Sequence, residues 1–170
     1  GVSAVSGPES EINRHDESRV IEAAKAISIP MDREIIHVLP QSFVVDDQPG
    51  IRDPIGMSGV RLEADVHMVT GAVTSAQNIC KSIRRAGVEV LDLVLEPIAA
   101  ANAVLSPEEE EMGVALVDVG GGTTDLAVFY DGSVRHTAVI GLGGENVTHD
   151  VSIGLRTPWK QAEEIKRIHG

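Results

Sequence analysis

The stretch VALVDVGGGTTDLAVFYDGSVRHTAVI, residues 114–140, places three consecutive glycines between two apolar segments, with an aspartate on each side. The segments before and after the glycines have the length and composition of strands. Later in the same stretch, Asp131-Gly132 is a strong signal for a two-residue hairpin turn. The stretch therefore predicts strands joined by tight connections, and the first connection is built almost entirely of glycine.

The glycine run suits a backbone that must approach an anion closely. Glycine tolerates positive φ and has no Cβ in the way. Successive N–H groups in such a turn converge on an anion, and two threonine hydroxyls follow them. These features favour a phosphate-binding hairpin over a plain glycine-rich bend, with these candidate residues: Gly120, Gly121, Gly122, Thr123 and Thr124.

The flanking carboxylates, Asp118 and Asp125, would repel a bare anion. They fit a phosphate site if a divalent cation, its water shell or an attacking water lies between carboxylate and phosphate. We therefore expect Mg²⁺ near Asp118, held through water. The competing nucleotide motifs are absent from the sequence, because neither G-x-x-x-x-G-K-[ST] nor a G-x-G-x-x-G before a helix occurs.

Composition excludes other classes of function. A net charge of -12 argues against DNA, RNA or anionic lipid as a direct partner. Hydrophobic residues make up 42% of the chain but aromatic residues only 2%, so the core must consist of Val, Ile, Leu and Ala. Cys80 is the only cysteine, which rules out an internal disulfide.

The first half of the chain predicts a small α+β unit. Residues 1–16 are polar, with an edge strand over residues 1–5 as their only suggested element. Residues 60–71 alternate apolar and polar side chains, which is typical of a half-buried strand. The remaining expected elements are a helix over 18–29 ended by Pro30, strands over 34–40 and 42–47, and a loop over 48–59.

In the second half, helices alternate with strands around one hairpin. Residues 113–120 are apolar on both faces, which predicts a central strand. The acidic segment 106–112 is either a helix start or a solvated turn. The other expected elements are helices over 74–87, 97–105, 144–155 and 157–170, and strands over 88–96, 124–130 and 133–142.

Several of these segments carry a family resemblance. LVDVGGGTTDLAVF (116–129) resembles the second phosphate-binding motif of the actin, DnaK-type chaperone and sugar kinase superfamily, and AGVEVLDLVLEPIAAANAVL (86–105) resembles the stretch before it. The segments RVIEAAKAI and REIIHVLPQSFVVDDQPGIRDPIGMSGVRLEADVHMVTG, with VRHTAVIGLGGENVTHDVSIGLRTPWKQAEEIKRIHG at the end, resemble the bacterial FtsA family. The resemblance covers almost the whole chain.

The resemblance implies an α/β fold in two parts. Residues 1–72 would form the α+β lobe called subdomain 1C. Residues 73–170 would form part of an actin-like, ribonuclease H-like mixed sheet with flanking helices, subdomain 2A. Because the chain starts with Gly1 and family members are longer, the resemblance also implies a fragment.

The resemblance also assigns roles to individual residues. Asp118 matches the catalytic acid that positions Mg²⁺ or the attacking water, and the run 120–123 matches the β- and γ-phosphate cradle, with Thr124 a weaker candidate. Gly143 and Gly144 match a glycine pair ahead of a helix, where an anion is stabilised. Glu163 and Lys166 match a pair that holds the ribose hydroxyls, although from spacing alone a solvated ion pair is favoured.

At the level of the whole protein, the resemblance implies an ATP- and Mg²⁺-binding protein that links FtsZ filaments to the inner face of the bacterial cytoplasmic membrane. It would self-associate and contact the division protein FtsN through residues 1–72. The FtsZ-binding subdomain and the membrane helix are expected outside these residues. A DnaK-like chaperone, a sugar kinase and a plain interaction module are the alternatives. The chaperone would need its own domain in place of residues 17–71. The sugar kinase would need a sugar-binding domain and a catalytic base, and the sequence offers neither.

We predict that the isolated chain self-associates. A central strand needs cover on both faces, and apolar surface or an open sheet edge that lacks cover favours association. Sedimentation should show species heavier than the 18.0 kDa monomer. A single monomeric species that melts cooperatively would contradict the prediction.

Overall fold

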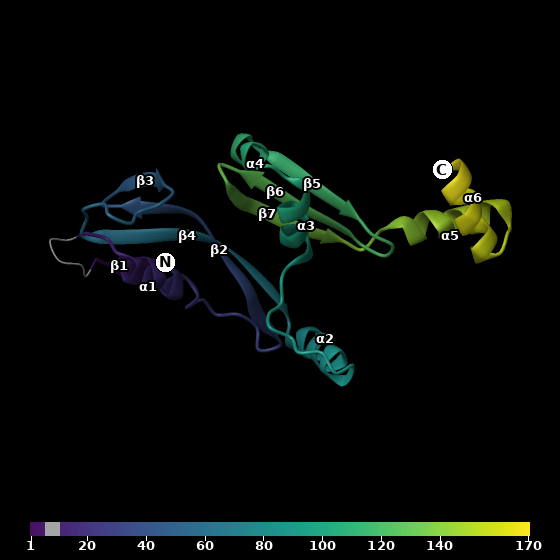
Figure 1. The fold of residues 1–170 in the computed structure, drawn as a ribbon, viewed down its shortest axis with the longest axis horizontal. Helices are drawn as coiled ribbons and strands as arrows, with labels where there is room; N and C mark the ends of the chain where they lie inside the picture. The colour runs from purple at the N-terminus through teal and green to yellow at the C-terminus, as the bar shows by residue number, and fades with distance from the viewer. Residues whose placement is uncertain (6–10) are drawn as a thin grey trace. The chain divides into compact units, whose positions relative to one another are not determined.

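A computed structural model describes residues 1–5 and 11–170, and it divides into two compact units (Figure 1). Residues 1–95 and 133–135 form the first unit, and residues 96–132 and 136–170 form the second. Each unit combines helices with a sheet, so the predicted α/β class is confirmed. The predicted domain boundary after residue 72 stays a prediction.

The first unit is built on a four-stranded antiparallel sheet. Its strands lie in the order β1 (Val2–Ala4), β4 (Arg61–Ala72), β2 (Arg33–Val45) and β3 (Gln48–Ile51). Helix α1 (Arg14–Ala24) lies against β1 and β4 (Figure 1). The strand expected over 60–71 and the edge strand expected over 1–5 are both confirmed.

One hydrophobic cluster holds α1 on this sheet. Leu62 and Ala64 on β4 are buried, whereas Arg61 before them and Asp65 after them are exposed, as the alternating pattern predicted. Burying side chains of this size contributes about 1.5–3 kcal/mol each, which is why a short helix remains docked. The buried members of the cluster are Ile12, Val20, Phe43, Val45, Leu62 and Ala64.

Two predictions about β2 and its surroundings are wrong. Pro40 does not separate two strands, because a register shift between Pro40 and Ser42 lets one strand continue past it. The segment expected to be a loop contains β3, which pairs with β2 across a turn. Asp46 and Asp47 both have positive φ in that turn, as hairpin turns of this length require.

Helix α1 starts four residues earlier than expected and ends at Ala24. Asn13 caps it by accepting bonds from the backbone N–H groups of His15 (2.8 Å) and Asp16 (3.2 Å). In return, the Asp16 carboxylate accepts from the Asn13 N–H at 3.2 Å. The prediction that residues 1–16 have little structure is therefore wrong for 11–16, and its part over 6–10 lies outside the described residues.

The strand expected over 88–96 is not present in the described structure. Helix α2 (Val73–Arg85) ends as expected, before Gly87 at a φ of +83°. The segment after it pairs with no described strand, and Leu91 is 91% exposed. Instead of a sheet ladder, the Leu95 N–H donates to His37 Nε2 at 2.9 Å. A strand cannot form without a neighbouring backbone to bond.

The second unit contains a three-stranded sheet, apart from residues 133–135 of its last strand, with two helices before the sheet and two after it. Its strands lie in the order β5 (Val114–Val119), β6 (Thr124–Tyr130) and β7 (Ser133–Ile140). Asp131 and Gly132 have φ of 59° and 66°, so the predicted hairpin turn is confirmed. The helices are α3 (Glu96–Val104), α4 (Pro107–Met112), α5 (Gly144–Leu155) and α6 (Trp159–His169).

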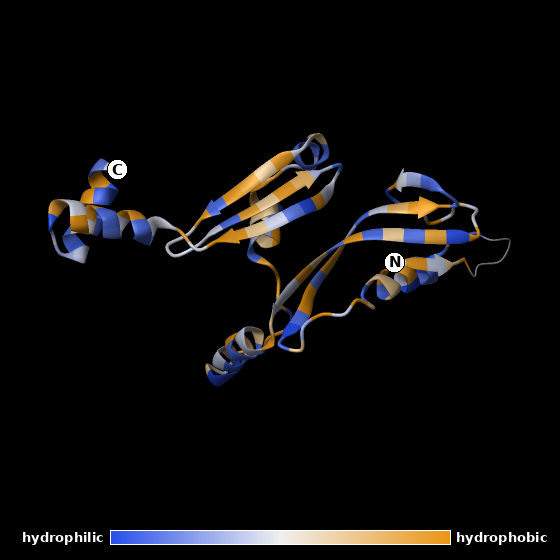
Figure 2. Ribbon diagram, turned by 180° about the vertical axis from the view of Figure 1, so that it is seen from behind, coloured by the Kyte–Doolittle hydropathy of each residue, from blue (hydrophilic) through white to orange (hydrophobic). Residues whose placement is uncertain are grey.

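The prediction that residues 113–120 form a central strand is wrong. Strand β6 is central, and β5 lies at an edge of this sheet. Consequently Val117 and Val119 are 55% and 65% exposed. Figure 2 shows hydrophobic segments in the strands of both sheets, and blue and orange residues that alternate along α5 and α6.

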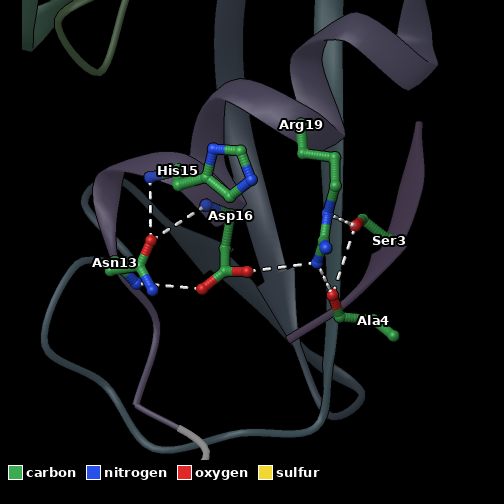
Figure 3. Close-up of polar contacts among 6 residues, drawn as sticks. All are labelled: Ser3, Ala4, Asn13, His15, Asp16 and Arg19. Carbon is green, nitrogen blue, oxygen red and sulfur yellow. Dashed lines mark hydrogen bonds and ion pairs between the residues drawn. The ribbon is translucent and has the colours of Figure 1, made fainter. Parts of the chain in front are cut away.

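A polar network fixes the start of α1 to the edge strand (Figure 3). The Asp16 carboxylate is fully buried and pairs with the Arg19 guanidinium at 3.1 Å. Arg19 Nε also donates to Ser3 Oγ at 2.8 Å, and its terminal nitrogen donates to the Ala4 carbonyl. One arginine thus joins β1, the helix and its capping carboxylate.

Among the described residues, no helix combines the length and apolarity needed to cross a membrane.

We predict that this network sets the stability of the first unit. Asn13→Ala should cost about 0.5–2 kcal/mol, because the first-turn N–H groups lose their acceptor. Asp16→Ala should cost more, roughly 2–3 kcal/mol, because Arg19 also loses its carboxylate partner. Hydrogen exchange at the β4 amides measures the loss. Glu22→Ala is the control: Glu22 pairs with Lys25 on the surface, so its removal should change the free energy by less than about 0.5 kcal/mol.

Candidate functional site

The glycine run forms the tight end of a hairpin between β5 and β6. Val119 pairs with Thr124, and the Gly120 N–H donates to the Thr123 carbonyl at 2.9 Å. The predicted hairpin is confirmed, but the reason first given for its glycines is not. None of the three has positive φ, although positive φ is found at five other glycines of the described chain.

What the loop requires is space for helix α5, which begins directly on it. A Cβ on Gly143 would lie 2.5 Å from the Gly121 carbonyl oxygen and 2.6 Å from that of Gly120, which is closer than real atoms come. The N–H groups of Gly144 and Glu145 donate to the same two oxygens at 2.9 and 2.8 Å. The first amides of α5 therefore bond to the loop, and they are not free for an anion.

This docking orients the loop's own amides. In a trans peptide the C=O and the following N–H point in opposite directions. Because the Gly120 and Gly121 carbonyls point at α5, the N–H groups of Gly121 and Gly122 point away from it. Neither amide has an acceptor in the part of the chain that the structure describes. Two adjacent donors are thus directed to one side, an arrangement that suits an anion.

The two threonines differ in what their hydroxyls do. Thr124 Oγ1 donates to the Leu142 carbonyl at 2.8 Å, so it ties β6 to the segment before α5. Thr123 Oγ1 lies 3.5 Å from Asp125 Oδ2, at the limit of a hydrogen bond. Thr123 is therefore the better placed of the two to bind a ligand.

Asp118 and Asp125 lie directly opposite each other on β5 and β6. Like charges in this position destabilise a sheet, and Asp125 is only 8% exposed. A divalent cation would relieve the repulsion. No group of three or more His, Cys, Asp or Glu side chains that could hold a metal occurs among the described residues. The donor set fits Mg²⁺, which keeps several waters and binds through one or two carboxylates plus phosphate.

Glu163 and Lys166 on α6 are joined to each other and to α5. Lys166 Nζ lies 2.7 Å from Glu163 Oε2, and it donates to the Gly144 carbonyl at 3.1 Å and to Thr148 Oγ1 at 2.8 Å. The hydrogen bond from Lys166, and after it the one from Thr148, lowers the pKa of Glu163. The pair is therefore more than a solvated ion pair, because it reaches the first turn of α5.

The structure thus brings together the glycine loop, the glycine pair at the start of α5 and Lys166, with the two aspartates on the same hairpin as the loop. Sequence reasoning missed Thr148, whose side chain is fully buried between α5 and α6. The only sequence signal was its position four residues after Gly144, on the same face of a predicted helix.

We predict that Gly143→Ala detaches α5 from the loop. The added methyl group must displace two carbonyl oxygens, at a cost of about 1–3 kcal/mol. Hydrogen exchange of the Gly144 and Glu145 amides should then accelerate. Gly122→Ala is the matched control, because a Cβ there has nothing within 4 Å and its φ is not positive. Equal exchange in both variants would contradict the prediction.

We also predict an acid-dependent contact between α5 and α6. The pKa of Glu163 lies below its ordinary value of 4.5, so its charged form stabilises the fold above that pH. The stabilisation should be lost as the pH falls through the lowered pKa. Thermal unfolding followed by Trp159 fluorescence should show wild type more stable than Glu163→Gln at neutral pH. The two should converge under acid conditions; a constant difference would refute this origin.

Comparison with known proteins gives the family. A family model described as the SHS2 domain inserted in FtsA matches residues 1–70, and a second, cell division protein FtsA, matches residues 115–170. Cell division protein FtsA of Pseudomonas aeruginosa is 55% identical over 92% of the chain, and that of Bacillus subtilis is 47% identical over all of it. The chain spans 37% and 39% of the lengths of these two relatives.

Solved structures agree on the fold. A chain of the PilM-PilN type IV pilus biogenesis complex superposes with a TM-score of 0.64 over 99% of this chain and 46% of that one. At 18% identity this likeness concerns the fold alone. The chain therefore shares the fold of that protein. With both family models and relatives of about half-identical sequence in agreement, the chain belongs to the FtsA family of cell division proteins.

Proposed function

We propose that the second unit supplies the phosphate-binding half of an ATP site in a cell division protein. The observation that carries the proposal is the docking of α5 on the glycine loop. In this docking the carbonyls of Gly120 and Gly121 accept hydrogen bonds from α5. The amides of Gly121 and Gly122 have no acceptor among the described residues. Phosphate oxygens are the natural acceptors for such a pair of amides.

Each candidate residue has a role in this proposal. The amides of the run 120–122 and the Thr123 hydroxyl bind the β- and γ-phosphates. Thr124, Gly143 and Gly144 act indirectly, because their bonds or their lack of a side chain hold the loop against α5. Asp118 positions Mg²⁺ through water, and the metal when bound neutralises charge on the phosphates.

Glu163 and Lys166 are assigned to the ribose hydroxyls. A carboxylate accepts hydrogen bonds from hydroxyl groups and an ammonium donates to them, so together they can bind both hydroxyls of a nucleoside. Their side chains are 39% and 22% exposed, so each can still reach a ligand. The ion pair between them would open partly when the nucleoside binds.

At the level of the whole protein, we propose the cell division role that the FtsA family implies. The protein would link FtsZ filaments to the inner face of the cytoplasmic membrane, self-associate, and contact FtsN through residues 1–72. Support comes from the family model over residues 1–70 and from the relatives, of which this chain spans less than half. The same model favours this role over that of a DnaK-like chaperone, a sugar kinase or an unrelated interaction module.

We predict weak, Mg²⁺-dependent ATP binding by the chain. In an NMR titration with MgATP, the amide signals of Gly121 and Gly122 should shift, and removal of Mg²⁺ should weaken binding. Mg²⁺ should raise the affinity for ATP roughly tenfold or more, as expected for a charged hydrogen-bonded contact. Asp118→Asn should abolish this effect of Mg²⁺ on the affinity. Asp150→Asn, an exposed change on α5, is the charge-matched control. Unmoved glycine signals at saturating MgATP would refute the site.

For residues 1–72, the proposed surface for protein partners, we predict the opposite pattern of NMR shifts. Residues 1–72 should give no shifts with MgATP, because they hold none of the proposed site. They should shift with a peptide from FtsN. Shifts with nucleotide and none with peptide would contradict the assignment of this lobe to protein contacts.

A further inference from the structure

Thr148 is a buried polar side chain that has no role in the proposed ATP site as described above. It lies on α5, is fully buried, and faces the pair on α6. Its Oγ1 lies 2.5 Å from Glu163 Oε2, 2.8 Å from Lys166 Nζ and 3.1 Å from the Gly144 carbonyl. A threonine in the second turn of a helix can satisfy its hydroxyl on its own backbone alone, so the two side-chain contacts require another explanation.

The direction of these bonds follows from counting protons. A hydroxyl has one proton to donate and lone pairs to accept, whereas an ammonium only donates. Lys166 therefore donates to Thr148, and the single hydroxyl proton goes to the closer and charged acceptor, Glu163. The ion pair closes the cycle at 2.7 Å. Each of the three side chains is thus oriented by the other two.

The cycle matters because Glu163 and Lys166 could not hold this geometry alone. Both side chains are long and partly exposed, and an ion pair of that kind contributes little fixed structure. Thr148 is short and buried, so it provides a fixed point. The helix that carries it is in turn bonded through Gly144 to the loop carbonyl of Gly120.

We propose that Thr148 is a positioning residue, which holds Glu163 and Lys166 at a set place relative to the phosphate loop so that a nucleoside triphosphate can span both. This proposal rests on the proposed ATP site. Thr148 itself does not touch the nucleotide. It acts through the orientation of the pair that contacts the ribose, while the phosphate contacts remain with the loop.

The first test needs no nucleotide. Thr148→Val keeps the shape of the side chain and removes the hydroxyl, whereas Thr148→Ser keeps the hydroxyl. An NMR titration of the Glu163 carboxyl should show its pKa raised toward the ordinary value in Thr148→Val and unchanged in Thr148→Ser. An unchanged pKa in the valine variant, or an equal rise in the serine variant, would overturn the proposal. The serine variant also decides the question if the valine variant fails to fold.

The second test asks which part of the nucleotide is affected. Wild type and Thr148→Ser should bind ATP roughly tenfold more tightly than 2′,3′-dideoxy-ATP, which lacks both ribose hydroxyls. Thr148→Val should lose that preference and keep the wild-type affinity for inorganic triphosphate. A retained preference would overturn the proposal. If wild type binds none of the three ligands, the proposed ATP site fails, and the Glu163 titration alone decides whether Thr148 positions the pair.

Discussion

The second unit depends on one contact, the seating of the α5 N-terminus on the carbonyls of the glycine loop. Two backbone hydrogen bonds, from Gly144 to Gly120 and from Glu145 to Gly121, make this contact. It is possible only because Gly143 has no side chain, since a Cβ would overlap both loop oxygens. The positive end of the helix dipole adds to it, because the carbonyls carry partial negative charge.

The contact has two consequences for the rest of the proposed site. It directs the loop amides away from the helix, because each peptide unit is planar and trans. It also fixes the start of a helix that carries Thr148 one turn further along, and through Thr148 it fixes the pair on α6. The two ends of the proposed nucleotide site are therefore parts of one hydrogen-bonded framework. A change at the loop should be felt at Glu163 and Lys166.

The sequence predicted those elements that depend on local chemistry. The turn at Asp131-Gly132, the glycine end of α2 and the alternation along β4 were all correct, because turn residues, caps and period-two patterns act over a few residues. The cap at Asn13 has a local signal of the same kind, because Asp16 follows three residues later.

Errors arose where the outcome depends on distant backbone. Residues 34–40 and 42–47 were expected to form two strands, yet pairing with β4 on both sides of a register shift makes them one. Residues 88–96 have strand composition but no described strand beside them, and β5 has apolar faces yet lies at an edge. Composition predicts how apolar a segment is, whereas its neighbours in the sheet depend on the whole topology.

The candidate site was predicted in part for the same reason. Asp118 and the glycine run are adjacent in sequence, so their chemistry could be inferred together. The cycle that includes Thr148 joins residues 15 and 18 positions apart, and no local pattern indicates it. The reason given for the glycine run was also wrong, since none of its three glycines has positive φ. The glycine that the close contact with α5 requires is Gly143.

The charge of the chain explains why the metal is central to the proposal. A net charge of -12 repels a nucleoside triphosphate, and the two aspartates beside the loop add to that repulsion locally. Lys166 is close to the first turn of α5, but Glu163 already neutralises it. Backbone amides are partial charges and cannot compensate for the carboxylates. A divalent cation between Asp118 and the phosphates reverses the sign of the interaction, because it converts the nearest repulsive group into a ligand. The arrangement therefore favours the magnesium complex of the nucleotide over the free anion.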